Sequence, residues 1–148
     1  IDDPHLRIAG FQQTLNAAGV TLDSELIEYN EPTLQGGEHA TQKLLAANKS
    51  FSAIFVYNDA MAIGVISTLE DNGFKVPSDI SILGFDDVLL SRYSRPKLTT
   101  LHYPIEEMAK QATNIALRLT GKTTTANTET SCKHIPRLVK RESTSLKR

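Results

Sequence analysis

Residues 51–57 read Phe-Ser-Ala-Ile-Phe-Val-Tyr, an almost continuously apolar run. A strand with apolar side chains on both sides must be covered on both faces, which is the situation of a central strand in a parallel sheet. Residues 80–85 form a second run of this kind. The two runs favour folds in which helices pack on both faces of one sheet.

Helical and extended patterns alternate along the rest of the chain. The apolar spacing predicts helices at residues 4–18, from after Gly37 to residue 47, at 60–71 and at 104–120. Strands are predicted at residues 25–31, 51–57, 80–85, 98–102 and 134–140, with a surface loop at 122–131. This alternation predicts an α/β fold built on a doubly wound, mostly parallel sheet.

The composition suits one globular domain. With 148 residues, 40% of them hydrophobic and 22% charged, the chain is long enough to bury a core without disulfides or a structural metal. Its single cysteine, Cys132, cannot form an internal bridge and is compatible with a reducing cytoplasm. No apolar run approaches the roughly 20 residues that cross a bilayer, so we predict no membrane segment.

Charge is distributed unevenly. Residues 133–148 carry a formal charge of +5 and the rest of the chain −6. The acidic body argues against direct binding of a phosphate backbone, because duplex binding relies on clustered lysine and arginine. We interpret the basic tail as a solvated strand edge and chain end.

Two polar pairs follow the two apolar runs directly. In open parallel sheets, ligands bind beyond the carboxyl ends of the strands, where Asn58-Asp59 and Asp86-Asp87 are expected to lie. Helix capping explains the first pair equally well. Turn chemistry explains the second less well, because adjacent acids at a buried strand end are costly without a partner. Arg7, at the start of the first helix, is a further candidate, with a surface charge as the alternative interpretation.

A carboxylate, a carboxamide and a guanidinium that converge on one cleft can read hydroxyl groups. The acid accepts hydrogen bonds, the amide donates and accepts, and the arginine donates in a fork. Such a set suits a sugar. Phe55, Tyr57, Phe85 and Tyr103 are candidates for an apolar floor under a sugar ring, although core packing is the alternative for each and is favoured for Phe55.

Catalytic alternatives find little support. Paired acids suit Mg²⁺, but the lysine and the third strand-end acid of a phosphoryl-transfer site do not stand out. The four histidines lack metal-ligand spacing, and no serine lies in a nucleophile elbow. Gly36-Gly37 has no phosphate-loop motif around it. We therefore predict that the chain is not an enzyme and needs neither a metal nor a cofactor.

Several longer strings carry a resemblance to a known family. They are ISILGFDDVLLSRYSRPKLTT at 80–100 followed by HYPIEEMA, RIAGF at 7–11, AIFVYNDAMAIG at 53–64 and LVKREST at 138–144. Across essentially its whole length, the chain resembles the effector-binding core of the lactose/galactose repressor (LacI/GalR) family of bacterial transcription regulators. The strings SRYSRPKLTT and HYPI are most similar to the galactose-operon repressor branch.

The resemblance implies a periplasmic-binding-protein-like module of two lobes. An N-terminal helix-turn-helix head binds operator DNA as a dimer, and an inducer between the lobes changes their orientation and the operator affinity. Transferred position by position, the ligand-binding residues are Arg7, Asn58 and Asp86. Tyr103 and Ile105 fall where the chain crosses to the other lobe, and Tyr103 is included in the predicted site.

The resemblance also implies a division of the chain. Residues 1–102 correspond to the C-terminal lobe, truncated at its N-terminus so that its first strand is missing. Residues 103–148 correspond to a crossover helix of the other lobe plus the C-terminal strand and tail, and the DNA-binding head is absent. The missing strand belongs between residues 25–31 and 53–57, so two edges are left unpaired. We expect that the natural protein is longer, or that another chain or a rearranged pairing fills the gap.

The expected function is therefore the sugar-binding and dimerisation region of a cytoplasmic, galactose-responsive repressor. Its expected partners are a sugar effector, a second copy in a homodimer, and operator DNA through a head outside this chain. The alternative is a periplasmic-type sugar-binding protein of the same fold. A third class, a Mg²⁺-dependent phosphatase, predicts metal binding at Asp86 and Asp87.

Overall fold

A computed structural model of the chain describes residues 4–121 and 133–146. Its helices are α1 (Pro4–Ala17), α2 (Leu34–Ala46), α3 (Asp59–Asp71) and α4 (Ile105–Leu119), with two 3₁₀ turns, η1 (Ser24–Leu26) and η2 (Leu89–Arg92). Its strands are β1 (Ala53–Phe55), β2 (Ser81–Asp86), β3 (Thr99–His102) and β4 (Arg137–Val139). The loop predicted at 122–131 lies outside the described residues.

The four strands form one sheet in the order β1-β2-β3-β4. The first three are parallel, and β4 pairs with β3 in the antiparallel direction. Four of the five predicted strands thus contain an observed strand, in most cases a shorter one. The predicted α/β class with a mostly parallel sheet is confirmed.

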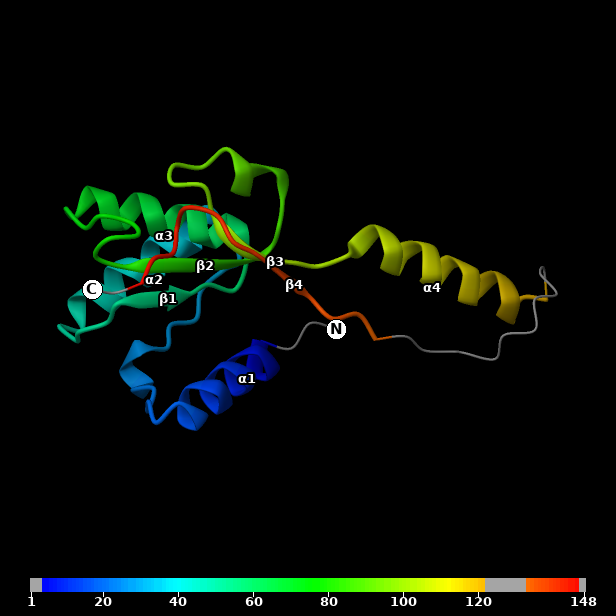
Figure 1. Cartoon of the computed structure of the whole chain (residues 1–148), viewed down its shortest axis with the longest axis horizontal. Coiled ribbons are helices and arrows are strands. Elements are labelled where there is room, and N and C mark those ends of the chain that lie inside the picture. Colours follow the sequence, from blue (N-terminus) through cyan, green and yellow to red (C-terminus); the bar gives the residue numbers. More distant parts are fainter. Residues whose placement is uncertain (1–3, 122–132, 147–148) are drawn as a thin grey trace.

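Helices cover both faces of this sheet. In Figure 1, α2 and α3 lie on one face and α1 on the other. Between α3 and the sheet, Leu69, Ile82 and Leu98 are completely buried and form the centre of the core. On the opposite face, the ring of Phe11 in α1 lies 5.5 Å from the ring of Phe55 in β1. This two-sided covering agrees with the apolar run that predicted β1.

Helices α2 and α3 pack against each other at glycines. A Cβ atom on Gly37 would lie 2.2 Å from the carbonyl oxygen of Met61, and one on Gly64 would lie 2.1 Å from that of Leu34. The two backbones therefore approach more closely than any side chain at these positions would permit.

The start of α2 corrects one expectation. The prediction that this helix follows Gly36-Gly37 is wrong, because the helix begins at Leu34 and contains both glycines. Thr33 provides the N-cap, and its Oγ1 accepts a hydrogen bond from the backbone N–H of Gly36 at 3.1 Å. The glycines are thus used for close packing within the helix rather than to begin it.

The strand predicted at residues 25–31 is also wrong. Its first part is in the 3₁₀ turn η1, where Asp23 Oδ1 accepts a hydrogen bond from the Glu25 N–H at 3.0 Å. Further along, the backbone is extended at Ile27 (φ −112°, ψ 113°), but none of the described strands pairs with this segment. Extended residues become a strand only when a neighbour supplies hydrogen bonds.

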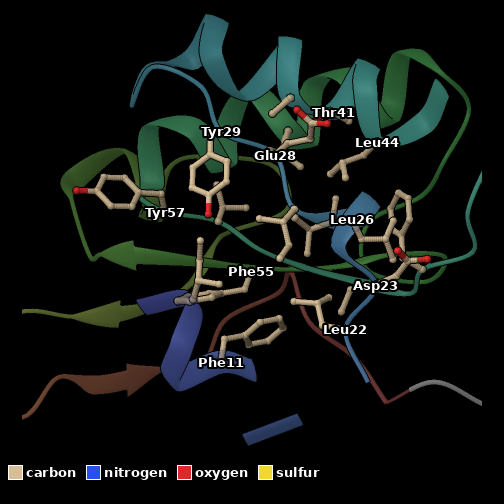
Figure 2. A pocket seen from close by; sticks show the side chains of 18 of the residues that line it. Phe11, Leu22, Asp23, Leu26, Glu28, Tyr29, Thr41, Leu44, Phe55 and Tyr57 are labelled. Carbon is tan, nitrogen blue, oxygen red and sulfur yellow. The ribbon is translucent and has the colours of Figure 1, made fainter. Parts of the chain in front are cut away.

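A cavity occupies the place where that neighbour would lie. It has a volume of about 780 Å³ and runs between β1, α1, α2 and residues 20–32. Its walls are mostly apolar, and Phe11, Leu22, Leu26, Leu44 and Phe55 gather around it (Figure 2). In the described part of the chain, no rearranged pairing fills the gap beside β1.

Helix α4 confirms the helix predicted at 104–120 and projects away from the sheet (Figure 1). None of its residues is buried, and apolar residues such as Ile105 and Leu119 are well exposed. Pro104 precedes its first turn. Glu106 and Glu107 lie within that turn, where their negative charges interact favourably with the positive end of the helix dipole. Among the described helices, none is long and apolar enough to cross a membrane.

Candidate functional site

The parallel strands bring their carboxyl ends to one edge of the sheet. Phe55 pairs with Leu83, so Asn58 and Asp86, each three residues further along its strand direction, are level with each other. Asp86 in turn pairs with His102, the residue before Tyr103. Three of the four predicted site residues, Asn58, Asp86 and Tyr103, therefore follow or end neighbouring strands at this edge.

Arg7 reaches the same edge from the first turns of α1. Its guanidinium carbon lies 3.7 Å from the centre of the Phe85 ring and 4.4 Å from that of Tyr57. Its Nη1 donates a hydrogen bond to the carbonyl oxygen of Tyr57 at 2.5 Å. The rings of Phe85 and Tyr103 lie 5.9 Å apart, so Arg7, Phe85 and Tyr103 form one continuous group. Contacts of a cation with ring faces hold the guanidinium in place.

Asn58 is engaged as a helix cap. Its Oδ1 accepts a hydrogen bond from the Met61 N–H at 2.8 Å, and its Nδ2 donates one to the Pro32 carbonyl at 3.1 Å. The capping interpretation thus describes what this side chain does in the structure. A contact of Asn58 with a ligand stays a prediction.

Asp59 is completely buried and ties three elements together. Its carboxylate accepts a hydrogen bond from Thr100 Oγ1 in β3 at 2.6 Å and from the Val88 N–H at 2.9 Å. Burial raises the pKa of Asp59 above its ordinary value, although these hydrogen bonds oppose the shift. Asp59 therefore secures the segment after β2 rather than facing a ligand.

The end of β2 has an unusual backbone. Asp86 and Asp87 have φ values of 109° and 59°, a region that residues other than glycine rarely adopt. The side chain of Asp87 is only 5% exposed and forms an ion pair with Arg141. His102 Nδ1 lies 3.1 Å from its other oxygen. The partner that a buried acid requires is thus present as the cationic side chain of Arg141.

Arg141 was not predicted as a site residue. Its side chain is 13% exposed, and its Nη1 donates hydrogen bonds to Ser91 Oγ at 3.0 Å and to the Leu98 carbonyl at 2.8 Å. Burial alone would raise the pKa of Asp87, but Arg141, together with His102 and Arg92, holds the pKa below its ordinary value. The interpretation of the basic tail as solvated is therefore wrong for this residue.

The C-terminal stretch places Arg141 by bridging the beginnings of β2 and β3. Ser143 is completely buried, and its Oγ donates a hydrogen bond to the Ile82 carbonyl at 2.6 Å and accepts one from the Thr99 N–H at 2.8 Å. The Arg141 N–H donates to Thr99 Oγ1 at 2.9 Å. The sequence signal for the pairing of Arg141 with Asp87 was the requirement of a buried acid for a cationic partner.

Replacing Asp59 with asparagine tests its buried charge. The folded-state pKa of Asp59 is raised, so wild-type stability falls as pH rises from about 4 through that pKa, because the folded state then binds more protons than the unfolded state. The asparagine side chain does not titrate. We expect the free energy of unfolding of Asp59→Asn, relative to wild type, to increase between pH 4 and pH 7 in urea titrations. A constant difference across this range would contradict a destabilising buried charge.

Comparisons with known proteins agree with this geometry. The model of the periplasmic binding protein-like domain matches residues 2–144. The chain is 43% identical over 145 residues to the HTH-type transcriptional regulator GalR of Salmonella typhimurium (strain SL1344), covering 98% of this chain and 42% of that protein.

Two solved structures extend the comparison. A sugar-binding transcriptional regulator of the LacI family from Escherichia coli, complexed with phosphate, has a TM-score of 0.86 and 28% identity, covering 97% of this chain and 51% of that one. The complex of the transcriptional regulator CelR with cellobiose has a TM-score of 0.79 and 29% identity, covering 93% and 41%.

The fold, its strand-end site and the family match define the chain as a periplasmic binding protein-like domain. Within that class, it belongs to the LacI/GalR family of transcriptional regulators, as the motifs at the carboxyl ends of β1 and β2 indicated. The chain spans less than half the length, 42%, of the Salmonella relative that it matches.

Proposed function

We propose that this chain is the effector-binding region of a transcriptional repressor that responds to a sugar, galactose in particular. The observation that carries the proposal is the group at the carboxyl edge of the sheet. Arg7 is stacked on Phe85, Phe85 contacts Tyr103, and Asp86 directly follows Phe85. This group combines a fixed cation, an acid and aromatic rings.

These groups suit the chemistry of a sugar. A carboxylate accepts hydrogen bonds from hydroxyl groups, a guanidinium donates in a planar fork, and an aromatic ring covers the apolar C–H face of a pyranose. Two structural neighbours, one a sugar-binding regulator and one in complex with cellobiose, support a sugar as the ligand class. The strings that resemble the galactose-operon repressor branch support galactose.

The proposal includes the wider arrangement. Residues 1–102 form most of one lobe, and residues 103–148 contribute a crossover helix to the other lobe and return as the C-terminal strand and tail. The exposed apolar side of α4 suits packing against that other lobe. A further stretch of the full-length polypeptide supplies the strand beside β1 and the head that binds operator DNA. The protein acts in the cytoplasm as a homodimer.

Calorimetric titration of D-galactose into the full-length protein, with D-glucose and D-ribose as controls, tests the ligand. We expect saturable binding of galactose and weak or no binding of the two controls. Release of operator DNA by galactose in the same preparation would support a repressor over a sugar-binding protein that delivers its ligand to a transporter. Absence of binding for all three sugars would contradict a galactose-responsive regulator.

The variant Asp86→Ala tests the site. Hydrogen bonds from sugar hydroxyls to a charged acceptor contribute about 1.5–3 kcal/mol, so we expect the Kd for galactose to rise by a factor of about ten to a hundred. Asp71→Ala is the matched control, because Asp71 is the last residue of α3, whereas the site lies at the N-terminal end of that helix. This variant should leave the Kd unchanged. If Asp86→Ala binds galactose as wild type does, this residue is not in the site.

A further inference from the structure

The backbone that carries Asp86 requires support from its surroundings. Both Asp86 and Asp87 have positive φ values, 109° and 59°. Non-glycine residues remain in this region only where neighbouring contacts hold them, and such residues gather at functional sites. The contacts around Asp87 therefore contribute to how Asp86 is presented.

Four elements supply those contacts. From η2, Ser91 Oγ donates to Asp87 Oδ1 at 3.3 Å, and Arg92 Nη2 lies 3.9 Å from Asp87 Oδ2. From α3, Asp59 accepts the Val88 N–H at 2.9 Å. From β3, His102 Nδ1 lies 3.1 Å from Asp87 Oδ2. From the C-terminal stretch, Arg141 Nη2 donates to Asp87 Oδ1. Val88 is the residue after Asp87, so the turn is secured on its far side as well as through the Asp87 side chain.

The Arg141 guanidinium is itself fixed. Its Nη1 donates to Ser91 Oγ and to the Leu98 carbonyl, at 3.0 and 2.8 Å. Its backbone N–H donates to Thr99 Oγ1 at 2.9 Å. Because the Arg141 backbone is anchored and Nη1 is held by two acceptors, Nη2 offers the carboxylate of Asp87 one defined position.

We infer that Asp87, held by Arg141, is the positioning residue for Asp86. The pair touches no ligand in this scheme and acts through the backbone that joins the two aspartates. This inference rests on the proposed function, because the pair is assigned the role of orienting the Asp86 carboxylate, which accepts hydrogen bonds from sugar hydroxyls. It also gives the C-terminal stretch a part in ligand recognition, since Arg141 lies 54 residues from Asp87 in sequence.

The test uses Asp87→Asn/Arg141→Met in the full-length protein. Both charges are removed together, and asparagine tolerates the positive φ of residue 87. The Kd for D-galactose should rise at least tenfold. The matched control is Lys97→Met/Glu142→Gln, which removes an exposed ion pair of 3.4 Å between the segment before β3 and the C-terminal stretch and should change the Kd less than twofold. An unchanged Kd in Asp87→Asn/Arg141→Met overturns the inference.

A double-mutant cycle separates positioning from a general structural effect. In the Asp86→Ala background, the same paired substitution should weaken galactose binding less than twofold, because the carboxylate that it positions is already gone. A full, additive loss in that background would show that the pair does not act through Asp86, and would overturn the inference.

A measurement without sugar keeps the inference separate from the proposed function. In ¹⁵N relaxation of the 148-residue chain, the order parameters of Asp86 and of residue 87 should fall from about 0.85 to below about 0.6 in the paired variant. A turn that stays rigid without the pair overturns the inference, whatever binds. If wild type binds none of the three sugars while the turn loosens as expected, the proposed function fails and the positioning of Asp86 stands.

Discussion

Replacing Arg141 by methionine lowers the free energy of unfolding by about 3–5 kcal/mol, the usual cost of removing one partner of a buried ion pair. The cause is Asp87, whose side chain is 5% exposed and loses its principal cation. Urea unfolding of the 148-residue chain, followed by far-UV circular dichroism, measures the difference. As a control, Lys110→Met breaks an exposed pair with Glu106 within α4 and should cost less than about 0.5 kcal/mol.

The pH dependence identifies the charge as the cause. In wild type, the lowered pKa of Asp87 gives stability that is present above the unfolded-state pKa and lost as pH falls below it. Without Arg141, burial acts with less opposition and raises that pKa, so the deficit of Arg141→Met should shrink between pH 7 and pH 4. Asp87→Asn/Arg141→Met should recover most of the stability at pH 7. If the double variant is as unstable as Arg141→Met, lost packing rather than unpaired charge explains the effect.

The substitution Gly64→Val should lower the free energy of unfolding by about 3 kcal/mol or more, at the upper end for overpacked sites. If the chain is only marginally stable, this loss prevents folding at 37 °C. A Cβ atom there would lie 2.1 Å from the Leu34 carbonyl oxygen, so α2 and α3 must move apart. Because this helix pair covers one face of the sheet, the separation exposes core residues such as Val65 and Leu69. Thermal unfolding measures the loss.

Gly10→Ala is the matched control for Gly64→Val. A Cβ atom on Gly10, within α1, would have no neighbour within 4 Å. Alanine there should stabilise the chain by about 0.5–1 kcal/mol, because it removes only the entropic cost of a helical glycine. If Gly64→Val melted at the wild-type temperature, the close approach of the two helices would be refuted.

The cavity beside β1 shows why one strand could be predicted from the sequence and another could not. Residues 51–57 are apolar on both sides because α1 covers one face of the sheet and α2 and α3 cover the other. This covering produces a local apolar pattern that can be recognised in the sequence. Whether residues 25–31 become a strand depends on a neighbour, and the structure offers none among its described strands. Local pattern predicts extended backbone, as at Ile27, but cannot supply the missing hydrogen bonds.

The candidate site divides in the same way. That Asn58 and Asp86 lie at one edge of the sheet followed from the sequence alone, because each comes at the end of a buried run and parallel strands end on the same side. The stacking of Arg7 on Phe85 depends on tertiary structure. For Asn58 the sequence left helix capping and ligand binding open, and the structure shows the cap. Sequence established which types of side chain are available, and packing established their contacts.

The chain's sequence by itself determined the α/β class, the mostly parallel sheet, the four helices and the strand-end placement of Asn58 and Asp86, because these depend on periodicity and on short-range capping. Only the tertiary structure decided that Arg141 pairs with Asp87 and that Gly37 and Gly64 lie where two helices meet. It also decided that β1 borders a cavity. The physical reason is that each of these features depends on contacts between residues far apart in sequence, which no local pattern records.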